Sequence, residues 1–224
     1  MKTELQERSC GTTMPWQWCN LRRNPFGELT RAERAQLAVV DIQGIVQQVS
    51  QDHTAVQFIG DCGRGKTTRM LALAHAMADA SYVYLPEDGP CPSIAVGRPI
   101  LIDEAQRLPR KVGKAVFASG LPLVLATHRD LSRSLRRFGY SVDTQSIGAA
   151  NTPELICKLL NRRVEASRRE PDVAVPRLSL HDATVLVRKF GSDVRSMESY
   201  LYDVVQSQSF VSLGLDHGQM RFVD

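Results

Sequence analysis

The sequence predicts an α/β fold, a P-loop αβα sandwich with a parallel sheet, followed by a small α-helical lid domain. Three observations favour this fold. Short apolar runs alternate with helical stretches in the middle of the chain, a glycine-rich loop joins one of these runs to a helix, and the last third shows helical periodicity without strands. Strands that alternate with helices are typical of a parallel sheet covered on both faces.

Short apolar runs bounded by turn residues are expected as strands. The four runs are Ala55–Ile59, Ser81–Leu85, Pro99–Ile102 and Leu121–Thr127. Their near-continuous hydrophobicity suits strands that are buried on both faces. Helices are expected at Thr67–Asp79 and Arg110–Ala118. The stretch 86–92 is rich in proline, so the connection between the second and third strands is expected to be a loop.

Helix-start signals define the remaining elements. Thr30 is followed by Glu33, a capping box that predicts a helix from about residue 31 to 50. Beyond Asn151, three helices without strands are expected, and they make up the lid. Their start signals are a capping residue or a glycine turn at Thr152, Ser179 and Gly191.

The composition is that of a folded domain. The chain has 224 residues, of which 43% are apolar and 23% are charged, so disorder, collagen and a disulfide scaffold are excluded for the whole chain. No apolar run approaches the roughly 20 residues that cross a bilayer, and the start lacks the apolar core of a signal peptide. We therefore expect a cytoplasmic protein with no membrane partner. Its five scattered cysteines are expected to be free thiols.

The strongest chemical signal is the segment Gly60–Thr67, which fits G-x-x-x-x-G-K-[ST] at every fixed position. Its backbone amides would converge on phosphate oxygens, Lys66 would reach the β- and γ-phosphates, and the Thr67 hydroxyl would ligate Mg²⁺. ATP and Mg²⁺ are thus the expected cofactors. The residues expected to contact the nucleotide are Gly60, Asp61, Cys62, Gly63, Arg64, Gly65, Lys66, Thr67 and Thr68. The alternative is a plain glycine-rich turn with an incidental lysine.

A second motif follows in the apolar run that ends in Asp103 and Glu104. If this strand lies near the phosphate loop, Asp103 would hold the Mg²⁺ shell and Glu104 would act as the general base. The alternative is that one of the two acids only caps the next segment.

With these two motifs, the chain resembles the AAA+ ATPases from about Asn24 to Gln206, and loosely the transposition-helper and secretion-associated members. The resemblance implies a first sensor at His128, with Thr127 beside it; an arginine finger at Arg137, with Arg136 as second candidate; and a second sensor at Arg195. A finger acts on a neighbouring subunit, which implies a homo-oligomer. Each of these side chains has a plainer alternative as a polar group on the surface.

The net charge of +4 hides a local basic surplus. Between Ala105 and Arg137 there is one acid, Asp130, against eight basic residues: Arg107, Arg110, Lys111, Lys114, Arg129, Arg133, Arg136 and Arg137. Such a stretch would suit a DNA backbone or the interface with a neighbouring subunit. Nucleic acid is therefore one candidate partner, beside an unidentified protein.

Four segments are expected: an irregular N-terminal arm (1–24), a P-loop ATPase core (25–148), a helical lid (149–207) and a C-terminal tail (208–224). This division leaves no room for a recognition domain, so specificity is expected from the core surfaces or from a partner. Two functions are compatible with it. One is an oligomeric Mg²⁺-dependent ATPase that remodels or regulates a macromolecular complex, with DNA as a candidate component. The other is a nucleotide-dependent switch or adaptor with little turnover.

Overall fold

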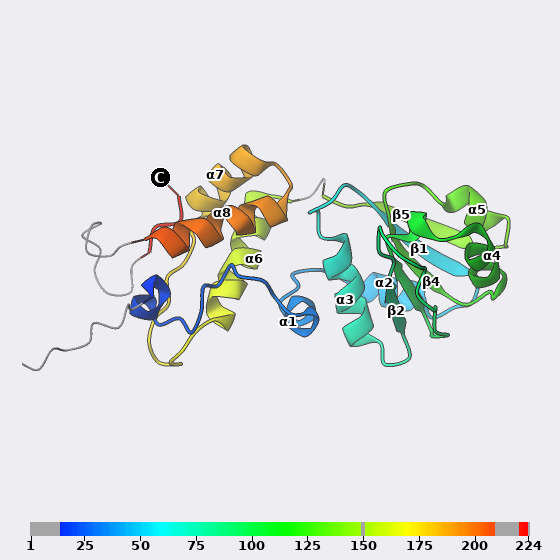
Figure 1. Cartoon of the computed structure of the whole chain (residues 1–224), viewed down its shortest axis with the longest axis horizontal. Coiled ribbons are helices and arrows are strands. Elements are labelled where there is room, and N and C mark those ends of the chain that lie inside the picture. The colour runs from blue at the N-terminus through cyan, green and yellow to red at the C-terminus, as the bar shows by residue number, and fades with distance from the viewer. Residues whose placement is uncertain (1–13, 149–150, 209–219, 224) are drawn as a thin grey trace, which may run out of the picture.

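The computed structural model describes residues 14–148, 151–208 and 220–223. It consists of an α/β lobe and a helical lobe, with the early helix α1 lying between them (Figure 1). Cys10, the first half of the expected N-terminal arm, the start of the expected lid at residue 149 and most of the expected C-terminal tail lie outside the described residues. Of the described cysteines, Cys62, Cys91 and Cys157 are free thiols, in agreement with the sequence prediction.

The α/β lobe is built on a parallel sheet of five strands in the order β2-β3-β4-β1-β5. The bounds are β1 Thr54–Ile59, β2 Ser81–Tyr84, β3 Ile100–Asp103, β4 Leu123–Thr127 and β5 Ser141–Ser146. The first four confirm the predicted strands, and β4 lies between the strands of the two motifs. The strand β5 was not predicted, because this edge strand is mostly polar and contains no apolar run.

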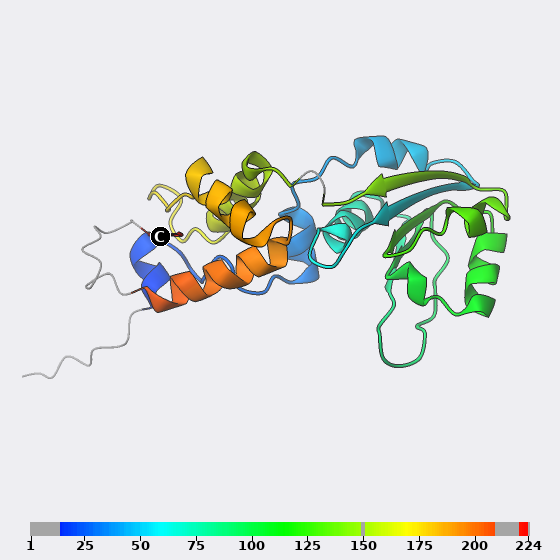
Figure 2. The same ribbon diagram turned by 90° about the horizontal axis from the view of Figure 1, so that it is seen from above.

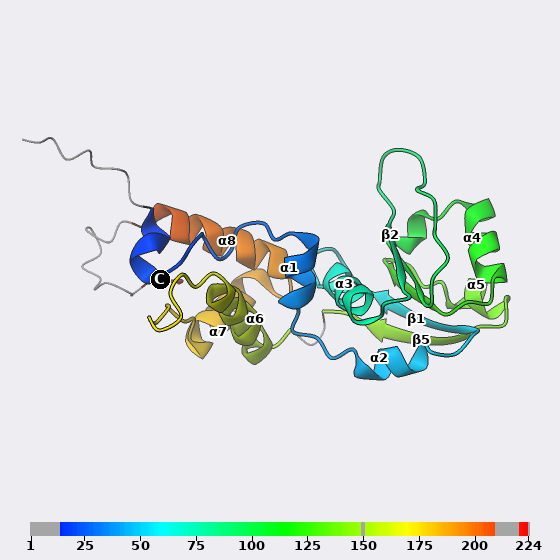
Figure 3. The same ribbon diagram turned by 90° about the horizontal axis from the view of Figure 1, so that it is seen from below.

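Helices cover both faces of the sheet, which confirms the predicted sandwich. On one face lie α2 (Gln43–Gln48) and α3 (Lys66–Ala76), and on the other α4 (Arg110–Ala118) and α5 (Ser132–Arg136). Successive residues of β3 enter opposite layers, as the pleat of a strand requires: Leu101 faces α3, whereas Ile100 and Ile102 face α4. The connection between β2 and β3 is the expected loop, and it projects from the sheet in Figures 2 and 3.

The prediction of one continuous helix over residues 31–50 is wrong. The chain forms α1 (Arg31–Gln36) and α2, with a non-helical segment over residues 37–42. Thr30 and Glu33 do form the expected capping box. The break has a tertiary cause: the guanidinium of Arg162 donates to the carbonyl oxygens of Gln36 (2.7 Å) and Ala38 (2.9 Å). These bonds satisfy carbonyls at the end of α1 that a continuing helix would otherwise pair.

The helical lobe contains the three predicted helices, α6 (Pro153–Ala166), α7 (Leu180–Phe190) and α8 (Val194–Ser207). Thr152 and Ser179 cap the first two as expected. The buried stripes of the three helices meet in one apolar core that includes Ile156, Leu160, Val164, Ala183, Leu186, Met197, Leu201 and Val205. Among the described residues, no helix combines the length and the apolarity needed to cross a membrane.

The described part of the N-terminal arm packs on the helical lobe. A 3-10 helix at Pro15–Cys19 precedes Leu21 and Phe26, and the side chains of Cys19, Leu21 and Phe26 enter the core of α6, α7 and α8. Asn24 is buried and its Nδ2 donates to the carbonyl of Tyr202 at 3.0 Å. The segment before α1 therefore belongs with the helices by packing, while the exact domain limits stay a prediction.

A buried glutamine connects the centre of the sheet to α5. The Nε2 group of Gln57, in β1, lies within 2.7 Å of acceptors on Asp130, Ser132 and Thr144, and its Oε1 accepts the N–H of Leu131 at 3.0 Å. Hydrogen bonds from the Ser132 hydroxyl and amide, and then from Gln57, lower the pKa of Asp130 to about 2. This network holds the turn between β4 and α5 in place. Arg136 and Arg137 lie beyond this turn, at the end of α5.

Replacing Gln57 by Leu is expected to lower the free energy of unfolding by about 1–3 kcal/mol, because it leaves buried donors and acceptors unpaired. Urea denaturation followed by circular dichroism measures the change. The matched control is Gln48→Leu, an exposed position on α2, which is expected to change stability by less than about 0.5 kcal/mol. Equal effects at the two positions would contradict the role of the network.

Candidate functional site

The phosphate loop has the expected context, since it leaves β1 and leads directly into α3. Lys66 is buried, and its Nζ donates to the loop's own carbonyl oxygens of Gly60 (2.6 Å) and Asp61 (2.9 Å). Burial lowers the pKa of Lys66, whereas Glu104, Cys62 and the two aspartates nearby act in the opposite direction. The loop thus holds an ammonium group at the start of a helix, where an anion is favoured by charge and by the free amides.

Asp103 lies at the end of β3 and is completely buried. Its carboxylate accepts hydrogen bonds from the Tyr82 hydroxyl and from the Glu104 amide, both at 3.1 Å. Burial raises the pKa of Asp103, while hydrogen bonds from Thr67 and Tyr82 oppose this shift. Thr67, at the start of α3, and Asp103, at the end of β3, therefore lie side by side, and their oxygens suit one shared cation.

Glu104 follows Asp103 in a left-handed backbone conformation with φ of 61°. Its Oε2 accepts from Gln106 Nε2 at 2.7 Å and lies 3.5 Å from Arg107 Nη2, while Oε1 lies 3.5 Å from His128 Nε2. Gln106 and Arg107 were not predicted as part of the site. Both follow the acidic motif in a short 3-10 helix (Ala105–Arg107), and this position is the only local signal for them.

The two candidates for the first sensor differ in what they contact. The Thr127 hydroxyl exchanges hydrogen bonds with the backbone of Arg129, at 2.9 and 3.0 Å. His128, in contrast, lies beside Glu104 and 3.8 Å from Cys62 Sγ in the phosphate loop. Of the two residues, His128 is the one whose side chain is among the groups of the site.

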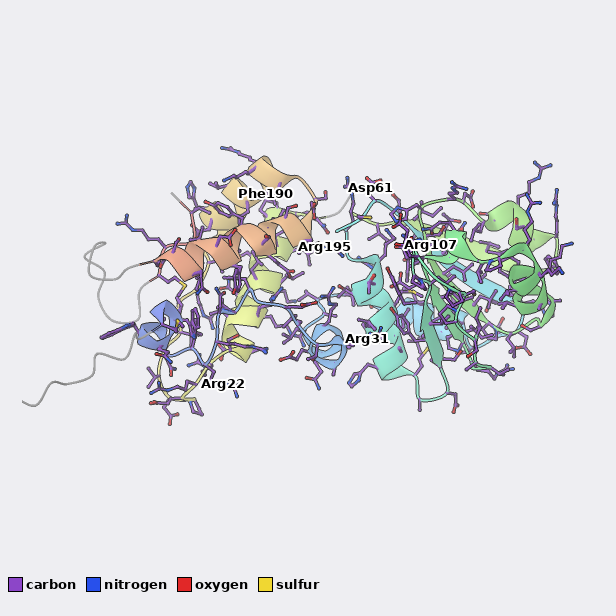
Figure 4. All side chains as sticks on the ribbon, in the orientation of Figure 1. Arg22, Arg31, Asp61, Arg107, Phe190 and Arg195 are labelled. Carbon is purple, nitrogen blue, oxygen red and sulfur yellow. The ribbon has the colours of Figure 1, made fainter. Side chains whose placement is uncertain are left out.

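The start of α8 closes on the phosphate loop. Gly63 has a φ of 77°, and a Cβ built on it would lie 2.1 Å from Oδ1 of Asp193, the residue that caps α8. Only glycine allows both this backbone and this approach. Arg195 is exposed in the first turn of α8, toward the α/β lobe in Figure 4. The second-sensor candidate and the loop therefore lie on opposite walls of one pocket.

This pocket lies between the two lobes. Its lining includes the whole segment 61–69 of the loop and α3, Glu104, and residues from α6 and α8. A third wall is the non-helical segment that breaks the predicted helix: Leu37, Ala38, Val39 and Val40. These apolar side chains and their backbone groups suit the flat, apolar faces of a nucleobase.

Arg163 and Glu198 are further pocket residues that were not predicted from the sequence. Arg163 in α6 is 4% exposed and forms an ion pair with Glu198 of α8. It also donates to the carbonyl oxygens of Pro25 (3.0 Å) and Gly27. In the sequence, an arginine next to the apolar stripe of a helix indicates a buried arginine of this kind. A buried charge requires a partner of opposite charge.

The two finger candidates lie outside the pocket. Arg136 and Arg137 are exposed at the end of α5, and Arg137 lines a separate groove between α4 and α5 with Phe117 and Phe138. Figure 1 shows α5 at the far side of the α/β lobe from the helical lobe. Neither arginine contributes to the pocket of its own chain. Among the described residues, the exposed cations of α4 and α5 form no ion pair: Arg110, Lys111, Lys114, Arg133, Arg136 and Arg137.

The residues present fit the two expected cofactors. A hydroxyl oxygen and a carboxylate oxygen are hard donors of the kind that Mg²⁺ prefers, and Thr67 and Asp103 supply them side by side. The pocket lining also contains three positively charged side chains that suit a polyphosphate: Lys66, Arg69 and Arg195.

Comparisons with known proteins add little to this picture. No protein-family model and no curated protein matches the chain. Among solved structures, a RuvB mutant from Thermotoga maritima is similar with a TM-score of 0.46 and 14% sequence identity, over 90% of this chain and 77% of that chain. That likeness carries no conclusion about the site, which stands on its own geometry.

Proposed function

We propose that the chain is a Mg²⁺-dependent ATPase of the AAA+ type that works as a homo-oligomer and remodels or regulates a macromolecular complex. The observation that carries this proposal is the pocket between the lobes. It joins the phosphate loop, Glu104 and Arg195, and the start of α8 closes it against Gly63. A change in the bound phosphates would therefore act directly on the position of the helical lobe.

Each residue has a defined task in the proposed reaction. The loop amides and Lys66 bind and orient the phosphates, and Thr67 and Asp103 would hold Mg²⁺, which supplies charge neutralisation when bound. The Glu104 carboxylate accepts a proton from the attacking water, and Gln106, Arg107 and His128 hold that carboxylate in place. Arg195 contacts the terminal phosphate from the helical lobe.

Arg137 is proposed to act on the nucleotide of a neighbouring subunit. Its exposed position away from its own pocket supports this role. The unpaired cations of α4 and α5 would then face the acidic residues of the neighbour's site or a DNA backbone, which are the partners that basic surfaces attract.

Mixing two defective variants tests the proposal. Arg137→Ala retains its own pocket, and Lys66→Ala retains its finger, so each alone is expected to show almost no ATP turnover. A mixture of the two is expected to regain turnover, because some interfaces then combine an intact pocket with an intact Arg137. The matched control is Arg188→Ala, an exposed arginine of α7 outside the pocket and outside the basic surface, which is expected to retain full turnover alone. A mixture as inactive as its components would contradict action between subunits.

A nucleotide-dependent adaptor is the second candidate function. It is favoured by the contacts of Glu104, whose two oxygens already face Gln106, Arg107 and His128. If these contacts persisted with ATP bound, the protein would bind a partner without hydrolysis. A wild-type protein that binds ATP and shows no turnover at any protein concentration, with or without DNA, would support the adaptor over the ATPase.

A further inference from the structure

Arg69 is a pocket residue whose charge no described group compensates. Six basic side chains line the pocket: Arg34, Arg64, Lys66, Arg69, Arg163 and Arg195. Arg64 pairs with Asp61 at 3.0 Å, Arg163 pairs with Glu198, and Lys66 donates to loop carbonyls. Within the described part of the chain, the Arg69 side chain has neither a hydrogen bond nor an ion pair, although it is partly buried.

The burial of Arg69 is not balanced by an acid. Its side chain is partly buried in the lining of the pocket, and no carboxylate of the described residues forms an ion pair with its guanidinium. A desolvated cation without a partner costs stability, so proteins keep such groups mainly at sites where a ligand supplies the missing charge. Arg34 and Arg195 also lack a side-chain partner among the described residues, but Arg195 is exposed and its charge stays hydrated.

Helix geometry directs Arg69 toward the phosphate loop. Side chains of an α-helix lean toward its N-terminus, so residue 69 of α3 lies over residue 65. The structure shows this approach, since a Cβ built on Gly65 would lie 3.6 Å from Nη1 of Arg69. Because Gly65 has no side chain, the guanidinium reaches the end of the loop where the amides of α3 begin.

The position of Arg69 also indicates which phosphates it can reach. Among the described residues, neither Glu104 nor Asp103 forms a hydrogen bond or an ion pair with Arg69, whose guanidinium approaches Gly65 instead. Arg69 therefore lies away from the acidic pair, beside which the terminal phosphate must react.

We infer that Arg69 is a nucleotide-binding residue that contacts a phosphate common to ATP and ADP. This inference rests on the proposed function, because it takes the nucleotide as the ligand of the pocket. It adds a residue outside the G-x-x-x-x-G-K-[ST] pattern, one helical turn beyond the loop. It also explains why an unpaired, partly buried arginine is placed at the start of α3.

The test is equilibrium binding of ATP and ADP by calorimetry, together with the melting temperature of the protein without nucleotide. Arg69→Met is expected to weaken both nucleotides by the same factor, about 10- to 100-fold, which is the range for a lost hydrogen bond to a charged group. Its melting temperature without nucleotide is expected to equal or exceed that of the wild type. Arg69→Lys, which keeps the charge, is expected to bind with intermediate affinity. The control is Arg31→Met on α1, which lies outside the pocket lining.

Three outcomes would overturn the inference. Arg69→Met could bind both nucleotides as tightly as the wild type, it could weaken ATP alone, or Arg69→Lys could bind as weakly as Arg69→Met. The first of these would leave the proposed function intact, since the wild type would still bind. A wild-type protein that binds neither ATP nor ADP would instead refute the proposed function, and the inference with it.

Discussion

Replacing Glu104 by Gln is expected to lower the rate of ATP hydrolysis by about 100- to 10,000-fold while ATP binding stays unchanged. A positioned general base contributes about this factor, and glutamine keeps the shape of the side chain but cannot accept a proton. Glu104 is 13% exposed and lies in the same pocket as Lys66. Turnover is measured by phosphate release at saturating ATP, and binding is measured by calorimetry.

The matched control for Glu104→Gln is Glu87→Gln. Arg107 Nη2 lies between these two carboxylates, 3.1 Å from Glu87 and 3.5 Å from Glu104. Glu87 is 81% exposed in the loop after β2, so its replacement perturbs Arg107 without removing a group of the pocket. Turnover close to that of the wild type is expected. Full turnover in Glu104→Gln would refute the assignment of this carboxylate as the base.

Replacing Arg163 by Met is expected to lower the free energy of unfolding by about 3–5 kcal/mol, because it leaves Glu198 without its buried partner. Arg163 connects three segments of the chain by its contacts. It pairs with Glu198 of α8, and it donates to carbonyl oxygens of Pro25 and Gly27 before α1. Urea denaturation followed by circular dichroism measures the loss.

A surface ion pair provides the comparison for Arg163. Arg169 and Glu170 lie 3.0 Å apart and are each 55% exposed, so Arg169→Met is expected to cost less than about 1 kcal/mol. Because Arg163 also lines the pocket, its replacement is expected to weaken ATP binding as well. A loss for Arg163→Met no larger than that for Arg169→Met would contradict its role in joining the segments.

Local signals were sufficient for the parts of the molecule whose structure depends on neighbours in the chain. The spacing of Gly60, Gly65 and Lys66 predicted the loop between β1 and α3, and Thr152 and Ser179 predicted two helix starts. Apolar runs predicted the four central strands, because these strands are buried on both faces. In each case the residues that determine the element lie within, or a few positions from, the element itself.

Structure that depends on distant residues was not predictable in this way. The break after Gln36 depends on Arg162, more than 120 positions away in the chain, and no local pattern marks it. The polar strand β5 forms because β1 offers it an edge to pair with. The contacts of Glu104 with His128, and of Gly63 with Asp193, likewise arise only when separate elements come together.

The proposed ATPase requires that the pocket between the two lobes bind ATP with Mg²⁺ through the phosphate loop. Calorimetric titration of the purified protein with ATP in the presence of Mg²⁺, alongside Lys66→Ala, measures this binding. The wild type is expected to bind one ATP per chain, and Lys66→Ala is expected to lose that binding, since it removes the buried ammonium of the loop. The absence of binding by the wild type, or equal binding by both proteins, would contradict the proposal.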